Sequence, residues 1–186
     1  ILSEPLPPAE HPYWRAAQHY ARGIAFARMG RFAEAHGERA AIEALRDSPG
    51  ASELAIGATS LEQLLQFAAV LLEGEIAAAE GRHEHAVATL HRAVLLQDLL
   101  PYTEPPDWFF PARQSLGAVL LDAGRPAEAE AVYWEDLRKN PENGWSLFGL
   151  AEALRAQGKD DAAAAVEKRF RKAWAAADVE LTASRF

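Results

Sequence analysis

Apolar residues, mostly alanine and leucine, recur at helical spacing along four stretches of the chain, and polar residues fill the positions between them. Each stretch ends at a glycine that is followed by a basic residue. The four pairs are Gly30-Arg31, Gly81-Arg82, Gly124-Arg125 and Gly158-Lys159. A glycine directly after a helix takes a left-handed backbone conformation that other residues avoid. The pattern therefore predicts four helix ends, each followed by a tight turn.

Small residues flank these turns at fixed distances. A glycine or alanine lies seven residues before each turn glycine, and an alanine lies five residues after it. The first set is Gly23, Gly74, Gly117 and Ala151, and the second set is Ala35, Ala86, Ala129 and Ala163. Two antiparallel helices can cross closely only where small side chains meet. We therefore expect four helical hairpins, each with one helix before its turn and one after it.

The last two hairpins repeat at an offset of 34 residues, and their residues carry a family resemblance. The pattern Leu116-Gly117, Leu120, Ala129, Tyr133 and Pro141 resembles the tetratricopeptide repeat (TPR). The resemblance implies an all-α, right-handed solenoid of four hairpins at about 16–49, 67–100, 110–143 and 144–177. Some positions depart from the family pattern. His19, Val70, Arg113 and Leu147 replace the usual tryptophan, and Arg39 and Glu167 stand where a large apolar residue is common.

Two irregular joins interrupt the predicted array. The first is an insert at 50–66, in which Ser60 and Gln63 match a capping box, so we expect a helix over about 61–80. The second is a loop at 100–111 that contains four prolines and several aromatic residues. The prolines exclude a continuous helix, and the aromatic residues argue against a solvated linker.

The two ends of the sequence differ. Residues 1–11 predict an extended, proline-rich connector, or a segment that folds back over the first helix. That helix opens at Pro12 and carries apolar groups on more than one face, which indicates that something packs before it. A last helix is expected at about 161–177, followed by a tail at 178–186. The strings around Tyr20, Gly74 and Tyr102–Trp108 resemble the C-terminal part of larger bacterial TPR proteins. The resemblance implies further repeats upstream, which would be partners within the same chain.

Composition and charge narrow the function classes. The chain has 186 residues, no cysteine and a formal net charge of −8. These values exclude thiol chemistry and disfavour nucleic-acid binding, because an acidic surface repels phosphate. No apolar run is long enough to insert into a membrane. A cytoplasmic location is favoured, and we expect the true N-terminus to lie upstream of Ile1.

Catalytic signatures are missing from the sequence. It contains no nucleotide-binding glycine motif, no nucleophile elbow and no zinc-protease motif. His83-Glu84-His85 has a superficial metal-ligand spacing, but adjacent side chains diverge on a helix and His91 shares their face poorly. We therefore expect no cofactor and no metal. The histidines are expected to be solvated.

A ligand groove is expected on the concave face that the resemblance assigns to the first helix of each hairpin. The loop at 100–111 would fold across this face and add aromatic rings and a carboxylate, a mixture found at binding hot spots. The candidate groove residues are Tyr20, Glu75, Tyr102, Glu104, Trp108, Arg113, Gln114, Trp145 and Phe148. The alternative is a loop whose aromatic residues only cap the core. Arg22 and Glu73 hold equivalent positions in consecutive repeats and are expected to form a buried charge pair.

The sequence favours a protein-interaction module that holds a peptide or protein partner in this groove. The alternative is the C-terminal half of an enzyme, or of a small-molecule or metal-binding protein, whose site is shared with upstream repeats. A third hypothesis is a purely structural spacer. Because no catalytic motif is present, an enzyme is the less favoured class.

Overall fold

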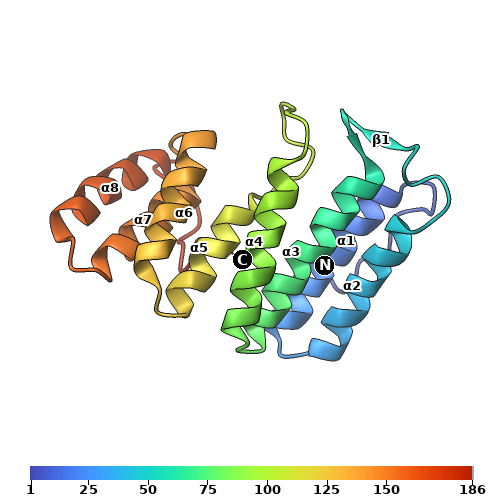
Figure 1. Ribbon diagram of the computed structural model, residues 1–186, viewed down its shortest axis with the longest axis horizontal. Coiled ribbons are helices and arrows are strands. Elements are labelled where there is room, and N and C mark those ends of the chain that lie inside the picture. Colours follow the sequence, from blue (N-terminus) through green and yellow to red (C-terminus); the bar gives the residue numbers. More distant parts are fainter. Residues whose placement is uncertain (186) are drawn as a thin grey trace. The chain divides into compact units, whose positions relative to one another are not determined.

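The computed structural model describes residues 1–185 and divides them into two compact units, one covering Ile1–Phe109 and one beginning at Phe110. Helices dominate both units, so the protein is all-α, as predicted (Figure 1). The first unit contains helices α1 (Pro12–Arg28), α2 (Phe32–Arg46), α3 (Leu61–Ala79) and α4 (His83–Asp98). The second contains α5 (Ala112–Asp122), α6 (Pro126–Lys139), α7 (Gly144–Arg155) and α8 (Asp160–Ala173).

Consecutive helices pack in pairs, and one helix in each unit is central. In the first unit, α3 packs against α1, α2 and α4, and most of its residues are buried. In the second unit, α7 packs against α5, α6 and α8. In each unit, therefore, the third helix rests on both helices of the pair before it.

The turn glycines adopt the predicted conformation. Gly30, Gly81, Gly124 and Gly158 have φ angles of 71°, 76°, 70° and 70°. The small residues also lie where helices cross closely. A Cβ on Gly23 would lie 2.6 Å from Leu72 Cδ2, and one on Gly74 would lie 2.6 Å from Leu90 Cδ2. The four alanines that follow the turns are buried.

Helix ends agree with the sequence at some places and differ at others. α3 begins with the predicted capping box, in which the Ser60 hydroxyl accepts a hydrogen bond from the Gln63 backbone N–H. The last helix ends at Ala173 rather than near residue 177. Trp174 is the C-cap residue, and its indole N–H donates to the Val179 carbonyl oxygen at 2.8 Å.

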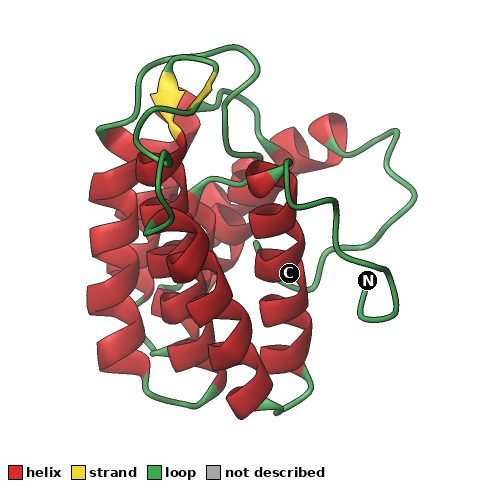
Figure 2. Ribbon diagram, turned by 90° about the vertical axis from the view of Figure 1, so that its right-hand side faces the viewer, coloured by secondary structure: helices red, strands yellow, loops and turns green. Residues whose placement is uncertain are grey.

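The insert between α2 and α3 holds a two-stranded antiparallel hairpin that the sequence reasoning missed. Strand β1 (Ala55–Ile56) pairs with β2 (Thr59–Ser60), and Gly57 has a φ of 59° in the turn between them. A two-residue connection with glycine at a left-handed position between β-branched residues is a hairpin signal. Figure 2 shows this hairpin at one end of the helices.

The N-terminal segment folds back over the first helix instead of forming an extended connector. Three side chains of α1 donate hydrogen bonds to its backbone carbonyl oxygens. Arg15 reaches Pro7 at 2.7 Å, Gln18 reaches Glu4 at 3.1 Å, and Arg22 reaches Leu2 at 3.3 Å. The alternative interpretation of this segment is therefore the correct one, because these donors on α1 hold it in place.

Candidate functional site

Trp108 lies in the core of the first unit. Only 2% of its surface is exposed. Its ring stacks on Phe109 with centroids 5.1 Å apart, and it meets Tyr20 of α1 edge-on at 5.3 Å and Phe67 of α3 edge-on at 6.0 Å. The predicted role of Trp108 as a ligand contact is therefore corrected. The loop inserts this ring between two helices, as the core-capping alternative expected.

Asp107 fastens the same loop to two other segments. Its backbone carbonyl oxygen accepts a hydrogen bond from the Tyr13 hydroxyl at 2.9 Å, and its carboxylate accepts one from the Thr59 hydroxyl at 2.7 Å. The Asp107 backbone N–H donates to the Thr103 hydroxyl oxygen at 3.2 Å. A Cβ on Gly57 would lie 2.5 Å from the Asp107 carboxylate, and the left-handed φ of 59° at this position also favours glycine. The start of α1, the β-hairpin and the loop thus meet at one residue.

An open groove of about 510 Å³ lies among these three segments. Tyr13 and Trp14 of α1 line it on one side, and Glu104 and Asp107 of the loop line it on another, with Ile56, Gly57, Thr103, Pro105 and Pro106 completing it. We call Tyr13, Trp14, Glu104, Asp107 and the adjoining Tyr102 the aromatic–acidic groove. Trp14 is 63% exposed and Tyr102 is 83% exposed, so two large rings face solvent here.

The polar groups of the aromatic–acidic groove perturb one another. The Tyr102 hydroxyl donates a hydrogen bond to the Glu104 carboxylate, and this bond, more than burial, raises the pKa of Tyr102. Burial, and then the nearby charge of Asp107, raise the pKa of Tyr13. Both phenols therefore stay neutral, and the negative charge of the groove comes from the carboxylates. Aromatic faces beside carboxylates attract a cationic group such as an ammonium or guanidinium.

Three other predicted groove residues are buried. Tyr20 and Glu75 are buried in the first unit, and Glu75 lies 3.9 Å from the Arg28 guanidinium. In the second unit, the buried Gln114 donates to the Asn143 side-chain oxygen at 3.0 Å.

Arg113, Trp145 and Phe148 are half-buried in the second unit. Trp145 meets Trp174 edge-on, with ring centroids 5.7 Å apart, and Phe148 meets Phe170 at 5.6 Å. Of the predicted groove residues, the structure leaves Tyr102 and Glu104 exposed, and both belong to the aromatic–acidic groove.

The predicted pair of Arg22 and Glu73 is replaced by two separate clusters. Arg22 Nε donates to Glu38 at 2.7 Å, and His19 Nδ1 lies 2.5 Å from the other oxygen of Glu38. Arg22 therefore reaches across its own hairpin to α2 instead of reaching the next repeat. The Glu38 carboxylate is buried between a guanidinium and an imidazole, which satisfies it.

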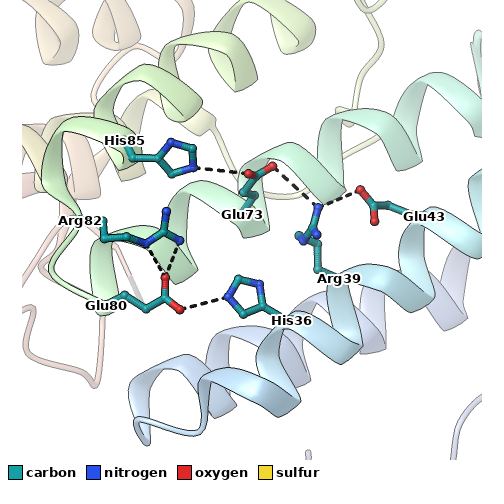
Figure 3. A network of polar contacts seen from close by, with 7 residues as sticks. All are labelled: His36, Arg39, Glu43, Glu73, Glu80, Arg82 and His85. Atoms are coloured by element: carbon teal, nitrogen blue, oxygen red, sulfur yellow. Dashed lines mark hydrogen bonds and ion pairs between the residues drawn. The ribbon is translucent and has the colours of Figure 1, made fainter.

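Glu73 belongs to a charged network on the surface of α2, α3 and α4 (Figure 3). Its carboxylate lies 3.8 Å from Arg39 and 3.4 Å from His85. In the same network, His36 lies 3.1 Å from Glu80, which also binds Arg82. His85 thus lies beside the Glu73 carboxylate, and no group of three or more His, Asp or Glu side chains that could hold a metal ion occurs among residues 1–185.

A buried carboxylate organises the second unit. Asp136 of α6 accepts hydrogen bonds from the Ser146 hydroxyl at 2.5 Å and from the Asn140 amide at 3.0 Å. Burial raises the pKa of Asp136. These bonds tie the end of α6 to the start of α7, so Asp136 has a positioning role.

No family model, curated protein or solved structure matches this chain. None of the helices described here is both long and apolar enough to span a bilayer.

Proposed function

We propose that this chain is a TPR-like helical repeat protein that binds a partner protein through the aromatic–acidic groove. The expected ligand is a peptide segment of the partner that exposes an arginine or a lysine. The observation that carries the proposal is a groove lined by the exposed Trp14 ring and by Glu104, whose carboxylate also accepts a hydrogen bond from the exposed Tyr102.

The repeat part of this proposal rests on helix packing. α3 lies on α1 and α2 in the first unit as α7 lies on α5 and α6 in the second. Each helix pair turns at a left-handed glycine. Stacked helical hairpins of this kind form extended surfaces suited to holding partners.

The binding part rests on energetics. A desolvated cation over an aromatic face gains up to about 2 kcal/mol, and a carboxylate adds a charge-assisted hydrogen bond. The formal net charge of −8 also favours the approach of a basic segment. The groove needs little ordering on binding, because Asp107 already fixes its loop to Tyr13 and Thr59.

The test is a set of short, dye-labelled peptides of equal length with Arg, Lys, Gln or Glu at the central position. The Arg and Lys peptides should bind, and Trp14→Ala and Glu104→Gln should each weaken them about tenfold, which corresponds to roughly 1.4 kcal/mol. Glu84→Gln changes the net charge by the same amount at an exposed position on α4, so it is the matched control. Equal binding of all four peptides, or equal loss in the control, would overturn the proposal.

A further inference from the structure

The segment after α8 returns to the second unit and becomes buried there. Residues 175–180 are exposed, yet Ser184 is 2% exposed and Arg185 is 8% exposed. Arginine is rarely buried to this degree unless its charge is paired. The segment is exposed after α8 and then buries two polar residues. These two residues must therefore have specific partners where the segment docks.

The Ser184 hydroxyl lies in a polar site built by two helices. It lies 2.5 Å from the Tyr133 hydroxyl of α6 and donates to the Gln114 backbone carbonyl oxygen of α5 at 3.1 Å. The Tyr133 ring is held in place by two glycines. A Cβ on Gly117 would lie 2.4 Å from this ring, and one on Gly149 of α7 would lie 2.2 Å from it.

The neighbouring Arg185 pairs with the same helix that receives Ser184. Its guanidinium donates to the Asp122 carboxylate of α5 at 2.7 Å. The Arg185 side chain is 6% exposed, whereas that of Asp122 is 52% exposed. The helices therefore offer two hydrogen-bond partners for a hydroxyl and, one residue further along the segment, a carboxylate for a guanidinium. We call Gln114, Asp122 and Tyr133 the Ser–Arg cradle.

We propose that the Ser–Arg cradle is a binding site for a peptide segment with a small hydroxyl residue followed by arginine, and that the chain's own segment 178–185 occupies it in cis. Gln114, Asp122 and Tyr133, which contact Ser184 and Arg185, belong to helices α5 and α6, and the exposed residues 175–180 tether the segment to α8. The tether gives the segment an effective concentration on the order of millimolar, so a peptide in trans binds only where the cis segment is released.

This site lies in the second unit and does not depend on the aromatic–acidic groove. Its selectivity follows from the contacts. A larger side chain in place of Ser184 should clash with Tyr133, because the Tyr133 hydroxyl already lies 2.5 Å from the Ser184 hydroxyl and its ring packs directly against Gly117 and Gly149. A lysine in place of Arg185 would offer a point charge instead of the planar fork that pairs well with a carboxylate.

The test uses the full chain with Arg185→Asp, which sets a carboxylate beside Asp122 and releases the segment. A labelled peptide with the sequence of residues 178–185 should bind this variant at least tenfold more tightly than it binds the unchanged chain. The charge-swapped double variant Asp122→Arg with Arg185→Asp should close the site again and exclude the peptide. A peptide with alanine in place of Arg185 should not bind.

Each remaining outcome overturns the proposal. If Arg185→Asp stays folded by circular dichroism yet does not bind the peptide, the cradle is no binding site. If Arg185→Asp abolishes the cooperative urea transition of the second unit, the segment is a core element and not a ligand in cis. Equal peptide binding by the unchanged chain and all variants would show that the contact does not involve the cradle.

Discussion

The Thr59 hydroxyl donates a hydrogen bond of 2.7 Å to the Asp107 carboxylate, and this bond joins the β-hairpin to the loop that carries Trp108. Thr59 is fully buried and Asp107 is half-buried, so the bond is partly shielded from water. The two residues are separated by helices α3 and α4 in the sequence. Because Tyr13 binds the same residue, Asp107 shapes the groove by holding its walls together.

Replacing Thr59 tests this relationship. Thr59→Val keeps the shape of the side chain but removes the donor, so it should lower the free energy of unfolding by about 1 kcal/mol. It should also weaken the binding of an Arg peptide at the groove, because the loop loses an anchor. Urea unfolding and peptide titration of the same variant measure both effects. Thr59→Ser, which keeps the hydroxyl, is the control and should retain the binding.

Trp108 and Tyr102 lie in the same loop but should contribute very differently to stability, because Trp108 is buried and Tyr102 is exposed. Trp108→Ala should lower the free energy of unfolding by about 3–5 kcal/mol, because it removes a buried ring from between Tyr20 and Phe67. Tyr102→Ala, at an exposed position, should change it by no more than about 0.5 kcal/mol. Urea midpoints of the two variants decide the matter. A small loss for Trp108→Ala would show that its ring is not part of the core.

Arg22 should be coupled to Glu38 and independent of Glu73. Removing Arg22 takes away one of the two partners of the buried Glu38 carboxylate, so a double-mutant cycle on Arg22→Leu and Glu38→Gln should give an interaction free energy of about 0.5–3 kcal/mol. The same cycle with Glu73→Gln should be additive within about 0.5 kcal/mol. Thermal or urea unfolding supplies the values. Coupling of Arg22 to Glu73 instead would restore the pairing that the sequence predicted.

Two glycine-to-alanine changes should alter the free energy of unfolding in opposite directions. Gly117→Ala drives a Cβ into the confined Tyr133 ring, so overpacking of about 1–3 kcal/mol should exceed the gain in helix propensity. Gly37→Ala lies on the exposed face of α2 with nothing within 4 Å, so it should stabilise by about 0.5–1 kcal/mol. Thermal denaturation of both variants measures the contrast, and a neutral Gly117→Ala would contradict the close crossing of α5 and α6.

Asp136 should make the second unit lose stability as the pH rises. Burial raises its pKa in the folded chain above the ordinary value of 3.8, so the folded state binds this proton more tightly than the unfolded state does. The contribution of Asp136 to the free energy of unfolding therefore falls as the pH rises from 3.8 to the raised pKa of the folded state. Above that pH the contribution no longer changes. Asp136→Asn removes this titration. Unfolding free energies of the two proteins should diverge with rising pH through that window, and a difference that is constant with pH would contradict the account.

The sequence predicts the helical framework well because the requirements behind it are local. A turn at Gly124 needs a left-handed residue, and the crossing at Gly117 needs a missing side chain, and both requirements are visible in the order of residues. The capping box at Ser60 is local in the same way. These features therefore appear in the structure at the predicted residues.

The site is harder to predict because it depends on contacts between distant residues. An aromatic ring in a proline-rich loop can face a ligand or fill a core, and Trp108 fills the core only because Tyr20 and Phe67 lie beneath it. The roles of Asp107 and Thr59 carry no sequence signal of their own. The hairpin turn at Gly57 does carry one, since a left-handed glycine joins two short β-branched segments there.

The five tryptophans allow one measurement to test the groove directly. In a nitrogen–proton correlation spectrum, each indole N–H gives its own signal, and an Arg-centred peptide is titrated into the unchanged chain. The account predicts that the Trp14 signal shifts with the bound fraction, while the signal of the exposed Trp134 on α6 stays in place. A Trp14 signal that does not move, while the signals of Trp134, Trp145 or Trp174 shift, would place binding in the second unit and contradict the proposed function.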